Sequence, residues 1–180
     1  AKLEPENIVV RNNLGHALNN EKKFAEAISH LECAVKLDPE NIAFRNNLAY
    51  ALNNEKRFAE AIPHLEYTMK IDPTDPYTRL DLGVAYNGLG KHAKALPHLK
   101  VAIQLDRRLP HPHLHLAETF RLLGRPMLAA TQLRKAFALA TAQSDKADRK
   151  ILRDKAKAGL VKAMPNRYPH KTRGGLKNKI

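Results

Sequence analysis

The sequence PENIVVRNNLGHALNNEKKFAEAISHLECAVKLD at residues 5–38 recurs as PENIAFRNNLAYALNNEKRFAEAIPHLEYTMKID at residues 39–72, with 24 of 34 positions identical and no gap. Residues 73–106 continue in the same frame, and residues 107–140 keep that frame with more substitutions. A fixed period of this length is typical of proteins built from stacked copies of one supersecondary unit. The sequence therefore predicts a repeat array.

Each unit contains two segments with the apolar spacing of an amphipathic helix. In the first unit these positions are Ile8, Leu14 and Leu18 in one segment, and Ala27, Leu31, Ala34 and Val35 in the other. The second segments are followed by Pro39 and Pro73. Each proline should end the helix before it, because proline cannot continue a preceding helix. We expect Pro63, Pro97 and Pro126 near the start of second helices, where first-turn N–H groups lack partners anyway.

The spacing of these residues resembles the tetratricopeptide repeat. The motif of that family is carried by Leu82-Gly83-Val84-Ala85-Tyr86, Ala95 and Leu99 in one unit, and by Leu14-Gly15, Ala27, Leu31, Ala34 and Pro39 in another. The resemblance implies an all-α, right-handed α-solenoid of about four 34-residue helix-turn-helix repeats, at 8–41, 42–75, 76–109 and 110–143. One departure concerns the large aromatic residue usual early in the first helix, which is replaced by Arg11, Arg45, Arg79 and His113.

Small residues at fixed positions should allow close helix packing. We expect Ala27, Ala61, Ala95 and Ala129 to let the two helices of a hairpin approach each other. We expect Gly15 and Gly83 to do the same between neighbouring hairpins.

The two ends of the chain differ from the repeats. Residues 1–7 resemble the end of a second helix, and we expect them to be the remnant of a preceding repeat in a longer natural chain. Residues 144–164 carry an apolar stripe opposite a charged face, which predicts a capping helix with a polar outer surface. Residues 165–180 contain two prolines, a glycine pair, five Lys/Arg and no acid, which predicts a flexible basic tail.

The net charge of +13 is concentrated at the C-terminal end. Residues 144–180 hold twelve Lys/Arg against three Asp, whereas residues 1–143 hold nineteen Lys/Arg against fifteen Asp/Glu. This asymmetry predicts RNA or another anionic partner at the tail. The tail residues expected to make that contact are Lys162, Arg167, Lys171, Arg173, Lys177 and Lys179.

The remaining composition restricts compartment and class. The single cysteine, Cys33, cannot form an internal disulfide and favours a reducing compartment. We therefore expect a cytoplasmic protein, with an organelle matrix as the alternative. No apolar stretch approaches the ~20 residues of a transmembrane helix.

No catalytic motif or cofactor site is recognisable, so we expect no enzymatic activity, no cofactor and no metal site in this chain. The sequence has no phosphate-binding glycine loop, nucleophile elbow or paired-cysteine zinc site. His111, His115 and Glu118 share one helix face with zinc-like spacing, but a fourth ligand is not evident. A polar helix surface is the favoured interpretation of these three residues.

Protein binding is the function that the resemblance implies, because the first helices of such repeats line a concave groove that holds partners. Mapping by repeat position predicts these groove residues: Asn12, Asn13, His16, Asn46, Asn47, Tyr50, Tyr77, Asp81, Asn87, His115, Glu118 and Arg121. An asparagine amide both donates and accepts, so it suits recognition of a peptide backbone. Asn19, Asn20, Asn53 and Asn54 lie where the first helices end, and we expect them to cap or terminate those helices.

Two subfamilies give more specific expectations. Asn13 and Asn47 are similar in position to the asparagine ladder in the repeats of O-linked N-acetylglucosamine transferase, which bind extended peptide, and Asp81 and His115 interrupt that ladder. The carboxylate-clamp repeats that hold chaperone tails need Lys and Arg where this chain has Asn12, Tyr77 and Asp81. The sequence therefore predicts no binding of acidic chaperone tails.

Three functions remain open at this point. The first is a protein-interaction scaffold or adaptor that binds an extended peptide or a partner helix in the groove. The second is a structural subunit of a ribonucleoprotein, for example one associated with the ribosome, that uses the basic tail. The third is the repeat arm of a longer enzyme.

Overall fold

The computed structural model describes residues 5–142 and 146–163, and within these ranges every regular element is an α-helix. Four helices occupy the first-helix positions of the repeats: α1 (Pro5–Asn20), α3 (Ile42–Asn54), α5 (Pro76–Gly88) and α7 (Pro110–Leu122). Their partners are α2 (Phe24–Leu37), α4 (Phe58–Ile71), α6 (His92–Leu105) and α8 (Pro126–Ala142), and α9 (Lys146–Ala163) follows. Among the described residues, no helix combines the length and apolarity that a membrane crossing needs.

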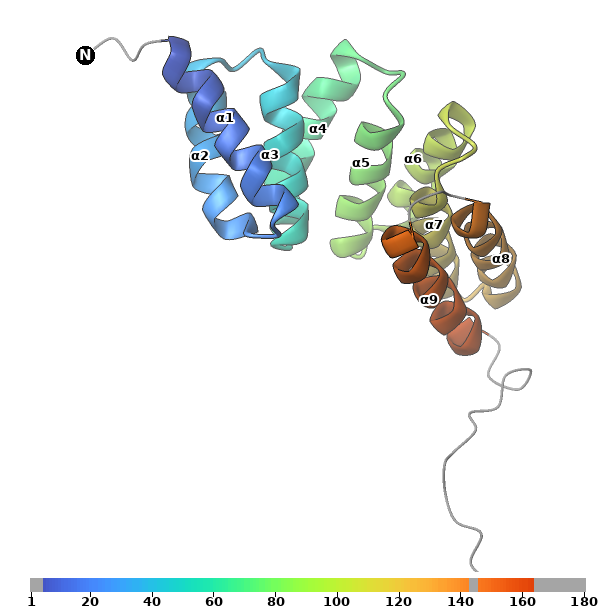
Figure 1. The fold of residues 1–180 in the computed structure, drawn as a ribbon. Helices are drawn as coiled ribbons and strands as arrows, with labels where there is room; N and C mark the ends of the chain where they lie inside the picture. Colours follow the sequence, from blue (N-terminus) through green and yellow to red (C-terminus); the bar gives the residue numbers. More distant parts are fainter. Residues whose placement is uncertain (1–4, 143–145, 164–180) are drawn as a thin grey trace, which may run out of the picture.

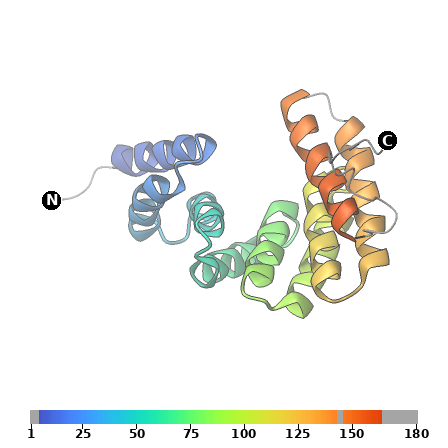
Figure 2. The same cartoon turned by 90° about the horizontal axis from the view of Figure 1, so that it is seen from below.

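The helices form consecutive antiparallel hairpins that stack into a curved array (Figure 1). Each helix packs on the next one in sequence, and α1, α3, α5, α7 and α9 also contact one another in succession. Viewed along a perpendicular direction, the array follows an arc with α1 and α9 towards its two ends (Figure 2). The predicted all-α solenoid with a closing helix is confirmed.

The first helices of the second and third repeats begin at capping side chains one repeat apart. Asn41 accepts hydrogen bonds from the main-chain N–H groups of Ala43 and Phe44. Asp75 accepts them from Tyr77 and Thr78. These contacts satisfy donors that have no partner inside the helix. The helix α1 begins at Pro5, three residues earlier than α3 begins in its repeat. Residues 1–4 of the predicted remnant and the tail from 164 onward lie outside the described residues.

The turn inside each hairpin has one residue in the left-handed region, at positions 34 residues apart. These residues are Lys22 (φ 62°), Lys56 (φ 62°), Gly90 (φ 71°) and Gly124 (φ 70°). Glycine adopts this conformation without steric cost, whereas a lysine Cβ is crowded there. The first two repeats therefore carry local strain that the last two avoid.

The prolines of the second helices do not all lie where the sequence predicts. Pro126 is the first residue of α8, as expected, but Pro63 and Pro97 lie inside α4 and α6, beyond the first turn. The missing N–H groups leave the carbonyls of Ala59 and Ala93 without their helical partner. Both alanines are solvent-exposed, so water can take the place of the lost donor.

The core is a seam of leucines and alanines between the helices. Leu31, Leu65 and Leu99 recur every 34 residues and are fully buried. Ala27, Ala61, Ala95 and Ala129 are at most 1% exposed, in agreement with their expected role. The prediction for Gly15 and Gly83 was wrong in one respect: a Cβ there would lie 2.5 Å from Cγ of Leu31 or Leu99, which belong to the partner helix of the same hairpin. These glycines therefore allow close packing within a hairpin.

Arg45, at the position where the tetratricopeptide resemblance leads one to expect an aromatic residue, packs against the second helix of its own repeat. The guanidinium of Arg45 donates to Nδ1 of His64 at 3.2 Å and lies 4.1 Å from the ring centroid of Tyr67. Burial, and secondly the charge of Arg45, lower the pKa of His64. At the equivalent position of the fourth repeat, Nδ1–H of His113 donates to Oε1 of Gln132 at 2.7 Å. A polar pair thus fills the place of an aromatic ring.

Candidate functional site: a groove along the first helices

A groove of about 820 Å³ runs along the first helices of the repeats. Residues of α1, α3, α5, α7 and α9 line it, so one continuous surface involves helices from both ends of the array. Its lining residues are His16, Asn19, Asn20, Asn46, Asn47, Tyr50, Asn53, Asn54, Tyr77, Leu80, Asp81, Val84, His111, His115 and Lys155.

The groove brings together seven of the predicted site residues. These are His16, Asn46, Asn47, Tyr50, Tyr77, Asp81 and His115. Glu118 and Arg121 line an adjoining hollow of about 370 Å³, which shares His111, His115 and Lys155 with the groove. Asn12, Asn13 and Asn87 do not line the groove.

Several asparagines of the predicted ladder bond to one another across the repeats. The amide of Asn47 donates to Oδ1 of Asn12 at 2.9 Å. Oδ1 of Asn46 accepts from the hydroxyl of Thr78 at 3.4 Å. Asn13 is exposed and takes no part in these two contacts. The polar surface is therefore partly engaged in holding the repeats together.

A second asparagine series joins consecutive first helices. The amide of Asn19 donates to the main-chain carbonyl of Asn47 at 3.0 Å, and that of Asn53 donates to the carbonyl of Asp81 at 3.1 Å. One repeat further, the amide of Asn87 donates to the hydroxyl of Thr119 at 2.7 Å. We expected Asn19 and Asn53 to cap helices and Asn87 to face the groove. Recurrence at an interval of 34 residues was the available signal, but it does not reveal which way an amide points.

Two tyrosines supply exposed aromatic surface to the groove. Tyr50 on α3 is 45% exposed and Tyr77 on α5 is 58% exposed. The Tyr50 ring meets Phe24 edge-on, with ring centroids 6.0 Å apart and an interplanar angle of 72°. Large exposed rings held beside polar amides are typical of surfaces that bind proteins.

Two groove side chains one repeat apart have strongly shifted pKa values. Burial, and secondly the carboxylate of Asp75, raise the pKa of Asp81 to about 7. Burial, with His111 and Lys155 adding to its effect, lowers the pKa of His115 to about 4. At neutral pH His115 is therefore uncharged, while Asp81 is close to the midpoint of its titration.

Glu118 and Arg121 form an ion pair at the edge of the adjoining hollow. The guanidinium of Arg121 donates through both Nε and Nη2 to the two carboxylate oxygens of Glu118. This contact lowers the pKa of Glu118. These two predicted site residues are therefore paired with each other. Among the described residues, no group of three or more His, Cys, Asp and Glu is arranged to hold a metal ion.

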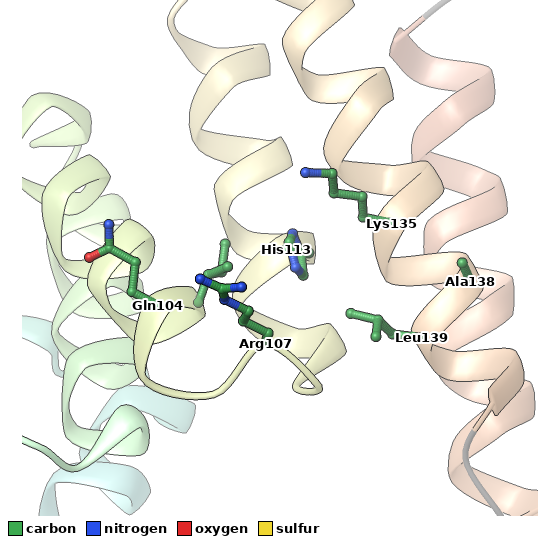
Figure 3. A pocket seen from close by; sticks show the side chains of 7 residues that line it. Gln104, Arg107, His113, Lys135, Ala138 and Leu139 are labelled. Carbon is green, nitrogen blue, oxygen red and sulfur yellow. The ribbon is translucent and has the colours of Figure 1, made fainter.

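Another hollow of about 500 Å³ lies against α6, α7 and α8 and shares no lining residue with the groove. Ile103, Ala138 and Leu139 give it apolar surface. Three basic or titratable side chains also line it: Arg107 from the turn between α6 and α7, His113 from α7 and Lys135 from α8 (Figure 3). His113 is already bonded to Gln132, and none of the predicted groove residues lies here.

Comparison with known proteins agrees with this architecture. Residues 8–41 match the family model of the tetratricopeptide repeat. The comparison with curated proteins gave no significant match. The family match thus covers one of the repeats that the sequence predicts.

Solved structures of similar fold extend over most of the chain. A thermophilic tetratricopeptide-repeat protein of Thermus thermophilus, TTC0263, aligns with a TM-score of 0.67 and 23% identity over 88% of this chain and 90% of its own. MamA from Desulfovibrio magneticus RS-1 aligns with a TM-score of 0.67 and 24% identity over 75% of this chain and 76% of its own. PcrH, solved in complex with the chaperone-binding region of PopD, aligns with a TM-score of 0.63 and 24% identity over 68% of this chain and 90% of its own.

Proposed function

From the fold of a tetratricopeptide-repeat solenoid, we propose that this chain is a protein-interaction scaffold that binds an extended peptide segment in the groove along α1, α3, α5 and α7. The observation that supports this proposal is the groove of about 820 Å³, in which exposed tyrosine rings and side-chain amides lie on one surface. PcrH, whose fold is similar, was solved with the chaperone-binding region of PopD. A partner helix is the other form that the bound segment can take.

The chemistry of the groove suits a segment with apolar side chains and an accessible backbone. Tyr50 and Tyr77 offer apolar area that a bound segment buries, which is the main source of affinity at protein interfaces. Asn20, Asn46 and Asn54 line the same surface and carry groups that pair with peptide N–H and C=O. Rings give affinity in this arrangement, and amides give orientation.

The test uses selection from a random peptide library displayed against the full chain. Selected peptides are synthesised, and their Kd is measured by calorimetry for the unmodified chain and for Tyr50→Ala/Tyr77→Ala. We expect the double substitution to weaken binding roughly a hundredfold, at about tenfold for each lost aromatic anchor. Ile71→Ala is the matched control, because Ile71 is 59% exposed and lies outside the groove.

Failure of this proposal has a clear signature. If no peptide is enriched, or if the double substitution leaves the Kd unchanged, the groove is not the binding surface.

A second function is proposed for the C-terminal segment, on the strength of its charge. Residues 144–180 carry nine more Lys/Arg than Asp. A segment of this charge binds phosphate backbones without base specificity, so the affinity should fall steeply as salt is raised. The experiment measures RNA binding by fluorescence anisotropy at several salt concentrations. Substituting Lys171, Arg173, Lys177 and Lys179 with Gln should abolish that binding, and retention of RNA affinity would rule out the tail as the contact.

A further inference from the structure

Asp81 is the one acidic side chain among the residues that line the groove. It lies on α5, one repeat after Asn47 on α3 and one repeat before His115 on α7. Tyr77 and Val84, one turn away on the same helix, also line the groove. The equivalent position in three consecutive repeats is therefore occupied by an amide (Asn47), a carboxyl group (Asp81) and a neutral imidazole (His115).

The carboxylate of Asp81 has no hydrogen-bond or ion-pair partner within the part of the chain that the structure describes. The amide of Asn53 reaches the main-chain carbonyl of Asp81, not its side chain. By contrast, Asp75 caps α5, and Glu118 pairs with Arg121. Asp81 is half-buried, so its carboxylate is only partly hydrated, and a partner can supply the hydrogen-bond donor that it lacks.

We propose that Asp81 is a specificity-determining residue, and that it recognises a lysine or arginine side chain of the peptide segment bound in the groove. The inference rests on the proposed peptide-binding function and adds the chemistry of one subsite. An ammonium or guanidinium group would neutralise the carboxylate of Asp81 and supply the hydrogen-bond donors that it lacks. Tyr77 gives the aliphatic stem of such a side chain an aromatic surface to pack on, with the cation near its face.

The charged and titratable groups around Asp81 are compatible with this role. Asp75, which caps the same helix, increases the negative potential at Asp81. Tyr50 on α3 and Tyr77 on α5 are phenols, and His115 on α7 stays neutral. The other ionisable groups along the groove are His16 on α1, His111 on α7 and Lys155 on α9. Among the described residues, the charge that shifts the pKa of Asp81 comes from Asp75 and not from these three groups.

The test compares library selections against the unmodified full chain and Asp81→Asn. Selection with the unmodified chain should enrich Lys or Arg at one fixed position of the peptide, and Asp81→Asn should lose that preference while keeping the preferences at other positions. Glu40→Gln is the control, because Glu40 is an exposed acid in the turn before α3 and should leave the selection unchanged. Circular dichroism confirms that each variant is folded.

A double-mutant cycle then isolates the contact. Replacing the enriched Lys with Gln in a selected peptide should weaken binding to the unmodified chain roughly tenfold or more, and it should have little effect on Asp81→Asn. Equal losses in both proteins would overturn the inference.

The possible outcomes separate this inference from the function on which it rests. If no peptide is enriched, the peptide-binding function itself fails. If peptides bind through Tyr50 and Tyr77 without a preference for a cation, only the role of Asp81 fails. The chain's own C-terminal basic residues are the competing cations: if the full chain with Lys171, Arg173, Lys177 and Lys179 changed to Gln binds the selected peptide more tightly, the assignment to a separate partner is overturned.

Discussion

The side-chain amide of Asn53 on α3 donates a hydrogen bond to the main-chain carbonyl of Asp81 on α5, at 3.1 Å. Asn19 makes the same contact one repeat earlier, to the carbonyl of Asn47. The donors are buried, with Asn53 only 7% exposed. Consecutive first helices are therefore joined by a polar bond as well as by apolar packing, and this bond holds the backbone of the groove in position.

Substituting Asn53 with Ala should lower the free energy of unfolding by about 1–3 kcal/mol, because the carbonyl of Asp81 loses its donor in a buried place. Urea denaturation followed by circular dichroism measures this loss. Asn54→Ala is the control, since the exposed amide of Asn54 donates only to the carbonyl of Tyr50 on its own helix. Equal effects of the two substitutions would show that the contact between helices adds nothing to stability.

Substituting Gly83 with Ala should destabilise the third hairpin by about 1–3 kcal/mol, because added volume in a packed core forces its neighbours to move. The new Cβ would lie 2.5 Å from Cγ of Leu99, which is fully buried. Thermal unfolding measures the effect. The double substitution Gly83→Ala/Leu99→Ala should show a smaller loss than the sum of the two single changes, and strict additivity would contradict the proposed clash.

Substituting Lys56 with Gly should raise the stability by up to about 1 kcal/mol, because Lys56 has a positive φ of 62° that glycine adopts without crowding. Lys56→Ala should bring no such gain, since alanine keeps the Cβ. The comparison of urea midpoints for the two variants separates backbone strain from loss of charge. A gain of equal size in both variants would assign the effect to the charge.

Substituting Asp81 with Asn should stabilise the chain at high pH and not at low pH. The folded-state pKa of Asp81 is raised from 3.8 to about 7, so its contribution to stability is fully present below pH 3.8 and is lost as the pH rises through 7. The amide introduced by Asp81→Asn does not titrate, so the difference between the two proteins should grow from pH 4 to pH 8.

Thermal unfolding across this pH range measures the difference. Four histidines have the opposite effect on stability, because their pKa values are lowered from 6.5 in the folded state: His64, His98, His113 and His115. They make both proteins less stable as the pH falls below 6.5. This effect is common to the two proteins and cancels in the comparison. A difference independent of pH would show that Asp81 does not titrate in the predicted window.

The sequence predicted the helices and their stacking because both follow from local spacing. The 34-residue period, the apolar stripes and the prolines each restrict a short window, and all of them agree. The buried series Leu31, Leu65 and Leu99 illustrates this agreement, since each leucine lies on the apolar stripe of its second helix.

The direction of individual polar side chains could not be predicted in the same way. Asn53 and Asn54 are adjacent in sequence and both line the groove, yet one reaches across to α5 and the other bonds to its own helix. Neighbouring positions on a helix point about 100° apart, so the crossing angle and distance of the next helix decide which amide finds a partner. The same limit applies to Gly15, whose neighbour Leu31 was identified only by the packing of α1 on α2.

The successive contacts between helices also have a mechanical consequence. In the portion of the chain that the structure describes, every helix touches only its first and second neighbours along the sequence. A force that pulls on the two ends of the array therefore acts on all the helix–helix interfaces in series. Each interface takes up part of the extension. Tyr50 lies on α3 and Tyr77 on α5, in different repeats, so a force on the ends should draw the two rings apart. A bound molecule that contacts both rings should therefore make the array stiffer.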